Sequence, residues 1–279
     1  MSGNLLIMFL IHLSKNLHSP MYFFITQLSF LDMMLSTNIL PNLLYIILYN
    51  GCTMSLTGCI SQFSFFATAE VSECLMLTVM SYDRYLAICR PLHYNSIINQ
   101  RFCIKSVIII WLLGFKVMLL DSVSLCSLHY CGPNIIDHFF CDIQPILELS
   151  CSDSSWVHIQ TIVIGFFCVL APFTMIVISY IYIVLTILRI PSISGRQKAF
   201  TTCSSHLIVV SIFFGSITIV YLFPTRGKIG VLGKVLSLFY TIFTPLLNPI
   251  IYTFRNKDFN KALINKALDK IKSDSGILW

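Results

Sequence analysis

Long uninterrupted runs of apolar residues dominate the chain, and polar positions collect in the short stretches between them. A helix of about 20 mostly apolar residues crosses a bilayer core about 30 Å thick. Strands of a membrane barrel alternate apolar and polar positions, so these continuous runs favour helices. Six runs are long enough to span: 21–48, 56–82, 103–125, 157–188, 200–223 and 230–254.

A seventh apolar run, residues 4–13, covers only about 15 Å as a helix. A signal-peptide core is one alternative, but the run lacks a basic start and a small-residue cleavage site. We therefore expect the remnant of a first helix whose beginning is absent, and with it a seven-transmembrane helix bundle.

Composition supports lipid as the solvent of this chain. Hydrophobic residues make up 56% of the 279 residues, charged residues make up only 11%, and the mean hydropathy is +0.82. Soluble domains carry about 25% charged residues, so this chain has too few charges to cover a soluble surface. We expect an all-α membrane protein with a single domain over residues 1–279.

Lysine and arginine gather on one side of the predicted membrane, and this bias sets the orientation. The amino end is predicted outside and the carboxy end cytoplasmic. Over 255–272, lysines and apolar residues recur near helical spacing, which predicts a short amphipathic helix on the inner leaflet; a disordered basic tail is the alternative. Fourteen of the 18 basic residues then lie inside: Lys15, Arg84, Arg90, Arg101, Lys105, Arg189, Arg196, Lys198, Arg255, Lys257, Lys261, Lys266, Lys270 and Lys272.

The chain has 11 cysteines, and those on the predicted outer side lie in an oxidising environment that allows disulfides. Cys131, Cys141 and Cys151 lie between the fourth and fifth helices, and Cys59 opens the third. Spacing alone permits three pairings. A metal site around His138 and Cys141 is the alternative, but its ligand set needs closure from elsewhere.

Three acids, Asp32, Glu70 and Glu73, lie inside the spans. A charge there costs at least about 2.5–3.5 kcal/mol and is usually functional. Glu70 and Glu73 are three residues apart and share one face of the third helix; the alternative is a pair of neutral acids hydrogen-bonded between helices. At the foot of that helix, Asp83 and Arg84 form either a solvated helix end or a switch.

Four prolines interrupt the spans: Pro41, Pro172, Pro245 and Pro249. Proline frees a backbone carbonyl and kinks a helix. Asn248 precedes Pro249, so we expect its amide to satisfy the freed carbonyl locally. A kink beside polar residues indicates a hinge, although static bundles also contain kinks.

Five motifs, in order over nearly the whole chain, resemble those of rhodopsin-like G-protein-coupled receptors, and within that family those of odorant receptors. LHSPMYFFITQLSFLDM at 17–33 is similar to the second-helix signature, and MSYDRYLAICRPLHY at 80–94 to the third-helix signature. SY at 179–180, KAFTTCSSHL at 198–207 and PLLNPIIYTFRNKD at 245–258 complete the series.

The resemblance implies a two-state switch at the cytoplasmic end. In the inactive state Asp83 holds Arg84. Released Arg84 meets two tyrosines while a cleft opens for the carboxy-terminal helix of a G protein. The expected switch residues are Asp83, Arg84, Tyr180, Asn248, Pro249 and Tyr252.

Ion and disulfide sites are implied by the same resemblance. A sodium ion is expected at Asp32, Glu73 and Asn248 in the resting state, where it offsets buried negative charge. No cofactor is expected to be required. The implied disulfides are Cys59–Cys141 and Cys131–Cys151.

The resemblance also implies an apolar and aromatic pocket for a small volatile molecule. Phe214 stands where the family usually has tyrosine, and Glu70 stands where its pockets are often neutral. Glu70 either faces the cavity and favours hydrogen-bond donors such as amines, or joins the sodium cluster, or pairs with Lys116. The expected lining is Phe66, Ala67, Glu70, Val71, Ile143, Ile164, Cys168, Phe214, Ile217, Tyr221 and Thr241.

The function implied is that of an odorant receptor in the plasma membrane, which activates a stimulatory, cyclic-AMP-linked heterotrimeric G protein. The bilayer is a further partner, and nucleic acid is not expected. The cytoplasmic segments carry no nucleophile–base pair or phosphate loop, so an enzyme is not expected. The alternatives are a truncated, non-signalling receptor relic and a transporter or channel, although the inverted repeats typical of transporters are absent.

Overall fold

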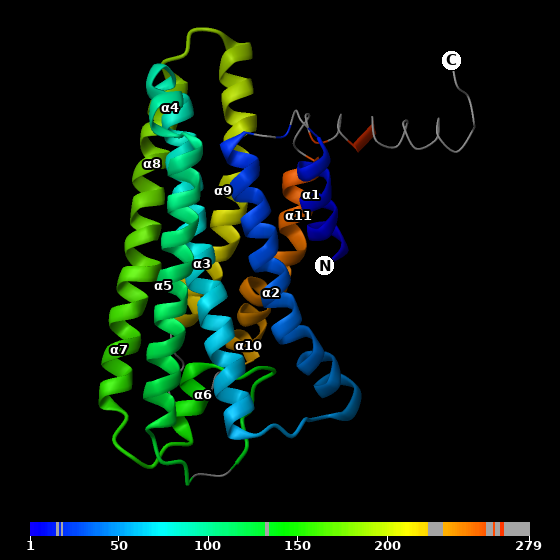
Figure 1. Cartoon of the computed structure of the whole chain (residues 1–279), viewed down its shortest axis with the longest axis vertical. Coiled ribbons are helices and arrows are strands. Elements are labelled where there is room, and N and C mark those ends of the chain that lie inside the picture. Colours follow the sequence, from blue (N-terminus) through cyan, green and yellow to red (C-terminus); the bar gives the residue numbers. More distant parts are fainter. Residues whose placement is uncertain are drawn as a thin grey trace, which may run out of the picture.

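The structure, a computed structural model, describes residues 1–14, 17, 19–131, 134–222, 231–254, 259 and 263–264. Within these ranges, the side chains of Lys198, Thr202, Tyr221, Leu222, Val231, Leu232, Thr253 and Phe254 are outside the description. Helices lying side by side make up nearly all of the described chain (Figure 1). The helices are α1 Ser2–Leu13, α2 Pro20–Tyr49, α3 Leu56–Cys89, α4 Pro91–Ile97, α5 Gln100–Cys126, α6 Ile143–Glu148, α7 Ser155–Gly165, η2 Phe166–Leu170, α8 Ala171–Leu188, α9 Ile193–Leu222, α10 Val231–Leu238, η3 Phe239–Phe243 and α11 Thr244–Phe254.

The six predicted spans are confirmed as helices long and apolar enough to cross a membrane. Two of them are joined pieces, because α7, η2 and α8 form one helix and α10, η3 and α11 form another. Helix α9 begins at Ile193, before the predicted start at residue 200. Its first turns are polar, so the pattern of apolar residues does not predict them.

Helix α3 is the centre of the bundle. In its most apolar window 78% of the residues are buried, compared with 11% for the Ser155–Leu188 span. Close packing against α5 occurs at Gly114, where an added Cβ would lie 2.7 Å from Ser72 Oγ and 3.3 Å from the Thr68 carbonyl oxygen. Helix α3 therefore runs through the protein interior from one end of the bundle to the other.

The two ends of the bundle differ in chemistry. The Arg84 end carries the Asp83–Arg84 pair and α4, at the top of Figure 1. The disulfide end carries Cys59, α6 and the loop between α5 and α7, at the bottom of Figure 1.

The short first helix, α1, packs on α2 and α11. At Gly3, an added Cβ would lie only 3.0 Å from Pro249 Cβ, so the two helices meet where one has no side chain. At the next residue, the buried Asn4 amide donates a 3.1 Å hydrogen bond to the carbonyl of Pro245. Pro245 is four residues before Pro249, so this is the carbonyl that the proline ring leaves without a helical donor.

The prediction that the Asn248 amide satisfies this carbonyl is therefore wrong. Asn248 does not satisfy it; its amide donates to both carboxylate oxygens of Asp32, at 2.9 and 3.1 Å. Asn4 supplies the hydrogen bond to Pro245 from another helix.

Two of the prolines coincide with π-helical turns. Pro172 follows η2, and Pro245 follows η3. A proline ring clashes with the carbonyl four residues before it and removes one hydrogen bond, and a wider turn relieves both effects. The helices are continuous through these sites.

Candidate ligand pocket and activation switch

Two disulfides hold the loop at the disulfide end. Cys59 at the start of α3 is bonded to Cys141, and Cys131 to Cys151, with Cα–Cα distances of 5.4 and 5.8 Å. This pairing resolves the three alternatives that spacing left open and confirms the expected pair of bridges. With Cys141 in a disulfide, the alternative metal site at His138 has lost its thiolate ligand.

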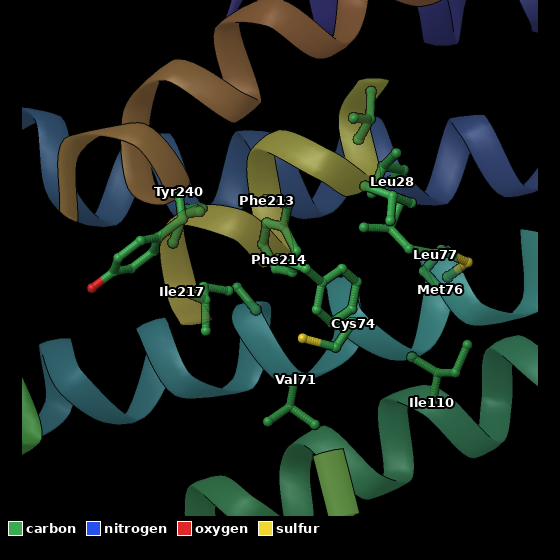
Figure 2. Packing of buried hydrophobic residues seen from close by; sticks show 14 of the residues in the cluster. Leu28, Val71, Cys74, Met76, Leu77, Ile110, Phe213, Phe214, Ile217 and Tyr240 are labelled. Atoms are coloured by element: carbon green, nitrogen blue, oxygen red, sulfur yellow. The ribbon is translucent and has the colours of Figure 1, made fainter. Parts of the chain in front are cut away.

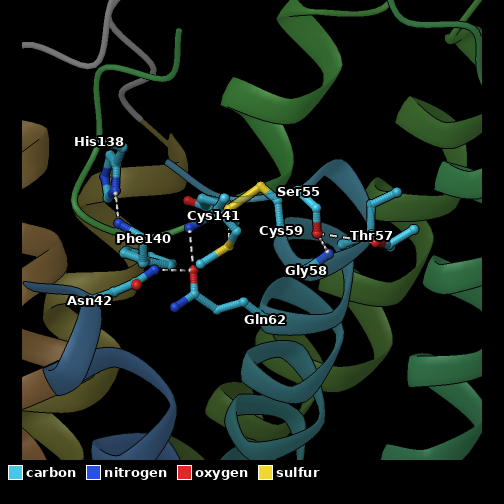
Figure 3. The surroundings of a disulfide bond; sticks show 12 residues. Asn42, Ser55, Thr57, Gly58, Cys59, Gln62, His138, Phe140 and Cys141 are labelled. Carbon is cyan, nitrogen blue, oxygen red and sulfur yellow. Dashed lines mark hydrogen bonds between the residues drawn. A yellow bond between two sulfur atoms is a disulfide. The ribbon is translucent and has the colours of Figure 1, made fainter. Parts of the chain in front are cut away.

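Gln62 anchors the same loop one turn below Cys59 (Figure 3). Its Oε1 accepts hydrogen bonds from the Cys141 amide at 3.0 Å and from Asn42 at 3.4 Å. Its Nε2 donates to the Asn38 carbonyl at 3.0 Å. One side chain thus joins α2, α3 and the loop, and it fixes how deeply the loop enters the bundle.

An aromatic cluster lies beneath this loop. The Phe66 ring of α3 lies 5.0 Å from that of Phe140 in the loop and 6.1 Å from that of Tyr240 in η3. Across the interior, Phe214 of α9 stacks on Phe173 of α8 at 5.1 Å. Figure 2 shows the α9 and η3 members of this region near α3.

The described members of the predicted lining are buried or half-buried, and they come from α3, α6, α7, η2, α9 and η3. Ile164 and Cys168 are only half-buried and pack against the core. The side chain of Tyr221 lies outside the description. Sequence reasoning missed Phe140 and Tyr240, although each adjoins a position that it had singled out.

Glu70 lies within this region on α3, with 8% of its surface exposed. The alternative pairing with Lys116 is not formed, because Lys116 is exposed on α5 and no ion pair joins the two among the described residues. The charged side chains that act on Glu70 are Asp142 and Glu73, both acids.

A cavity of about 350 Å³ opens at the disulfide end, next to the predicted pocket. Phe140 lines this cavity and also contacts Phe66, so the cavity reaches the aromatic cluster. A second cavity, of about 590 Å³, lies between α1, α2 and α5 at the Arg84 end. Neither cavity is lined by residues of the predicted pocket, and the first adjoins the aromatic cluster through Phe140.

Two titratable groups of the loop have shifted pKa values. Burial and the nearby Lys234 lower the pKa of His138 from 6.5 to about 4. Burial raises the pKa of Asp142 from 3.8 to about 6, although its carboxylate accepts a 2.7 Å hydrogen bond from the Ile143 amide. The loop over the pocket therefore contains two groups with opposite responses to acid.

A buried polar cluster lies between Asp32 of α2 and Glu73 of α3. The Asn248 amide donates to Asp32, and Glu73 and Asn4 lie close enough to influence the Asp32 carboxyl group. Both Glu73 carboxylate oxygens and the amide oxygens of Asn4 and Asn248 are buried without a hydrogen-bond partner among the described residues. Sequence reasoning missed Asn4, which lies on the helix farthest in sequence from Asn248.

These oxygens fit a small hard cation. Carboxylate and amide oxygens are the ligands that such cations prefer. In the described part of the chain no three His, Cys, Asp or Glu residues gather into a metal site, so a cation here would also need the amide oxygens of Asn4 and Asn248.

At the Arg84 end, Asp83 is held from two sides. Arg84 Nε donates to Asp83 Oδ2 at 2.9 Å, a second guanidinium nitrogen contacts the same oxygen, and Tyr94 of α4 donates to Oδ1 at 2.8 Å. Burial and the Asp83 carboxylate raise the pKa of Tyr94, which keeps its hydroxyl a donor. The charge pair is buried, so the simple solvated helix end is not what forms.

Neither switch tyrosine is hydrogen-bonded to Arg84 among the described residues. The Tyr180 hydroxyl lies 2.7 Å from Nδ1 of His206, a buried residue of α9. The Tyr252 hydroxyl is buried with no partner among the described residues. Sequence reasoning missed His206; its signal was a lone histidine inside an apolar helix.

Comparisons with known proteins agree with this architecture. A family model described as "Olfactory receptor" matches residues 1–270. The chain is 44% identical over 261 residues to olfactory receptor 11A1 of Homo sapiens, covering 94% of this chain and 82% of that receptor. It is 44% identical over 272 residues to olfactory receptor 5A1 of Homo sapiens, covering 98% and 86%, and 42% identical over 268 residues to olfactory receptor 1468 of Rattus norvegicus, covering 96% and 85%. The six apolar helices, the paired disulfides and these matches show a multi-pass membrane protein that belongs to the olfactory receptor family.

Proposed function

We propose that this chain is an odorant receptor of the plasma membrane that binds a small volatile molecule near the disulfide end and activates a stimulatory, cyclic-AMP-linked heterotrimeric G protein. The observation that carries the proposal is the course of α3. Phe66 lies in an aromatic cluster near one end of this buried helix, and the closed Asp83–Arg84 pair lies near the other. A ligand and a G protein therefore act on the same rigid element.

The proposed orientation places the Arg84 end in the cytoplasm, because most of the lysines and arginines of the chain lie on that side. The disulfides then face the oxidising exterior, in keeping with their chemistry. The expected amphipathic helix at 255–272 falls largely outside the described residues. Of its apolar positions, Phe259 is buried and its ring lies 6.3 Å from that of Tyr22.

The proposed mechanism is a population shift between two arrangements. We assign to the resting arrangement the observed geometry, in which Arg84 is bound to Asp83 and Tyr180 lies beside His206. A ligand held between α3, α9 and η3 favours an arrangement in which α9 moves and Arg84 meets Tyr180 and Tyr252. A differential affinity of about 5.5 kcal/mol moves such an equilibrium from 1:99 to 99:1.

The test is a cyclic-AMP assay against an odorant panel, with surface delivery measured in parallel. We expect a dose-dependent response to some odorants and none from Arg84→Ala at equal surface level. Silence of the wild type despite full surface delivery would favour the non-signalling relic. Ion flux in liposomes without a G protein would favour the channel.

A sodium ion in the resting state is the second part of the proposal. Asp32, Glu73 and Asn248 would hold it, with Asn4 as a further oxygen ligand. Glu73, Asn248 and Asn4 carry enclosed oxygens without a partner among the described residues, and Asp32 lies beside them. The ion supplies positive charge to the acids of the resting receptor. We expect purified receptor to unfold at a higher temperature in sodium than in choline chloride, and Glu73→Ala to abolish the difference.

A further inference from the structure

Glu70 is a buried acid without a hydrogen-bond or ion-pair partner among the described residues. It retains 8% of its surface, and no hydrogen bond or ion pair connects its carboxyl group to the described residues. Glu73, one turn away, differs because both of its oxygens are fully enclosed and those of Glu70 are not. Glu70 thus retains a small accessible surface at which a ligand group could approach it.

The electrostatic surroundings of Glu70 call for a cation. Its charged neighbours are two more acids, Asp142 from the loop and Glu73 from the deeper cluster. Lys116, the basic residue that the sequence offered as an alternative partner, is exposed on another helix. A buried carboxylate without a compensating charge is strongly unfavourable, so an incoming positive group would gain most at this position.

The immediate neighbourhood of Glu70 is suited to an organic cation. Glu70 lies one helical turn from Phe66, whose ring meets those of Phe140 and Tyr240. Aromatic faces attract ammonium groups, and the same rings accommodate a hydrocarbon tail. Asp142 acts on Glu70 from the loop, and the preceding residue, Cys141, lines the cavity of about 350 Å³.

We propose that the pocket recognises small aliphatic amines, whose ammonium group binds Glu70 while the hydrocarbon chain occupies the aromatic cluster. This inference rests on the proposed function and names the ligand class for that site. Phe214 and Ile217 make the α9 side of the predicted lining apolar, and Glu70 is the one acid among the predicted lining residues.

The test measures binding without relying on signalling. Thermal unfolding of purified receptor is recorded with hexylamine, octylamine and decylamine, and with the alcohols of the same lengths. A ligand that binds the folded state raises the unfolding temperature. We expect amines to stabilise the wild type at concentrations about ten- to a hundredfold lower than alcohols, the ratio expected for a charged hydrogen bond.

Three variants complete the design. Glu70→Gln keeps the shape and should lose the amine preference while retaining the alcohol effect. Glu70→Asp keeps the charge on a shorter side chain and should keep a reduced preference, which covers the case in which Glu70→Gln does not fold. Glu148→Gln removes an exposed acid from α6 and should behave as the wild type.

The outcomes are distinguishable from those of the proposed function. Equal stabilisation by amines and alcohols, no stabilisation by any amine, or an amine preference that survives in Glu70→Gln each overturn the inference. Amine binding that requires Glu70 but raises no cyclic AMP supports the inference and contradicts the signalling proposal. A cyclic-AMP response to alcohols alone does the reverse.

Discussion

The hydroxyl of Tyr180 lies 2.7 Å from Nδ1 of His206, and the two rings stack with their planes 13° apart. This contact joins α8 to α9 inside the bundle at the Arg84 end. In the proposed switch, Tyr180 has to leave His206 before it meets Arg84. The contact therefore belongs to the resting arrangement, and its loss should favour the other one.

Replacing His206 tests this reading. His206→Phe keeps a ring in the helix and removes the hydrogen bond, which is worth about 1 kcal/mol. We expect basal cyclic AMP to rise about fivefold in the low-activity regime. His158→Phe, on the exposed surface of α7, is the matched control. Unchanged basal activity in His206→Phe, at equal surface level, would contradict the role assigned to this contact.

A second prediction concerns Tyr94 at the other side of the charge pair. Tyr94→Phe removes the 2.8 Å hydrogen bond to Asp83 and leaves that carboxylate with Arg84 alone. We expect a rise in basal signalling of a few-fold, from about 1 kcal/mol. Tyr82→Phe, whose hydroxyl makes no hydrogen bond to the described residues, should leave the basal level as it is. Equal effects from the two variants would rule out a role for the Tyr94–Asp83 hydrogen bond in holding the resting arrangement.

Asn4 should stabilise the receptor through the Pro245 carbonyl. Asn4→Leu leaves that buried carbonyl without a donor, at a cost of about 1–3 kcal/mol. We expect a lower unfolding temperature for purified receptor. Ser2→Ala, an exposed change on the same helix, is the control and should have little effect. A normal unfolding temperature for Asn4→Leu would mean that another group satisfies the carbonyl.

The close approach of α5 to α3 predicts a contrast between two glycines. Gly114→Val places new atoms against Ser72 and Thr68, and overpacking of this kind costs about 1–3 kcal/mol. Gly165→Ala meets nothing within 4 Å and should be neutral or slightly stabilising. Unfolding temperatures measured side by side decide the matter, and similar values for the two variants would refute the packing argument.

Stability should depend on pH through two opposing groups in the loop. His138 has its pKa lowered to about 4, so it costs stability as the pH falls below 6.5. Asp142 has its pKa raised to about 6, so the cost of its ionised form is removed as the pH falls through 6. Between pH 7 and pH 5 each contributes about 1–2 kcal/mol with opposite sign.

Single variants separate the two contributions. His138→Gln should make the receptor more stable at pH 5 than at pH 7, because only the Asp142 effect remains. Asp142→Asn keeps an acceptor for the Ile143 amide and should make the receptor less stable at pH 5. The measurement is the unfolding temperature at the two pH values, with Glu148→Gln as control. A shift of the same sign in both variants would show that other groups dominate.

The apolar runs predicted the spans because lipid imposes a length and a composition that local sequence reveals. Contacts between distant segments left no such signal. Asn4 and Pro245 are 241 residues apart, and no pattern near either residue shows that they meet. The Lys116 alternative stayed open for the same reason, since helix periodicity gives a face but not the neighbour of that face. The switch and pocket roles of the remaining residues are inherited from the resemblance and stay predictions.

The Cys59–Cys141 bridge also constrains how the chain matures. Its two sulfurs are 82 residues apart, so in the proposed orientation the Cys59 thiol waits in the oxidising lumen until two further helices have been inserted. During this interval Cys52, an exposed thiol nearby in sequence, competes for the same oxidant. Receptor yield should then depend on the disulfide isomerase that corrects such early mispairing, and a Cys52→Ser chain should need that help less.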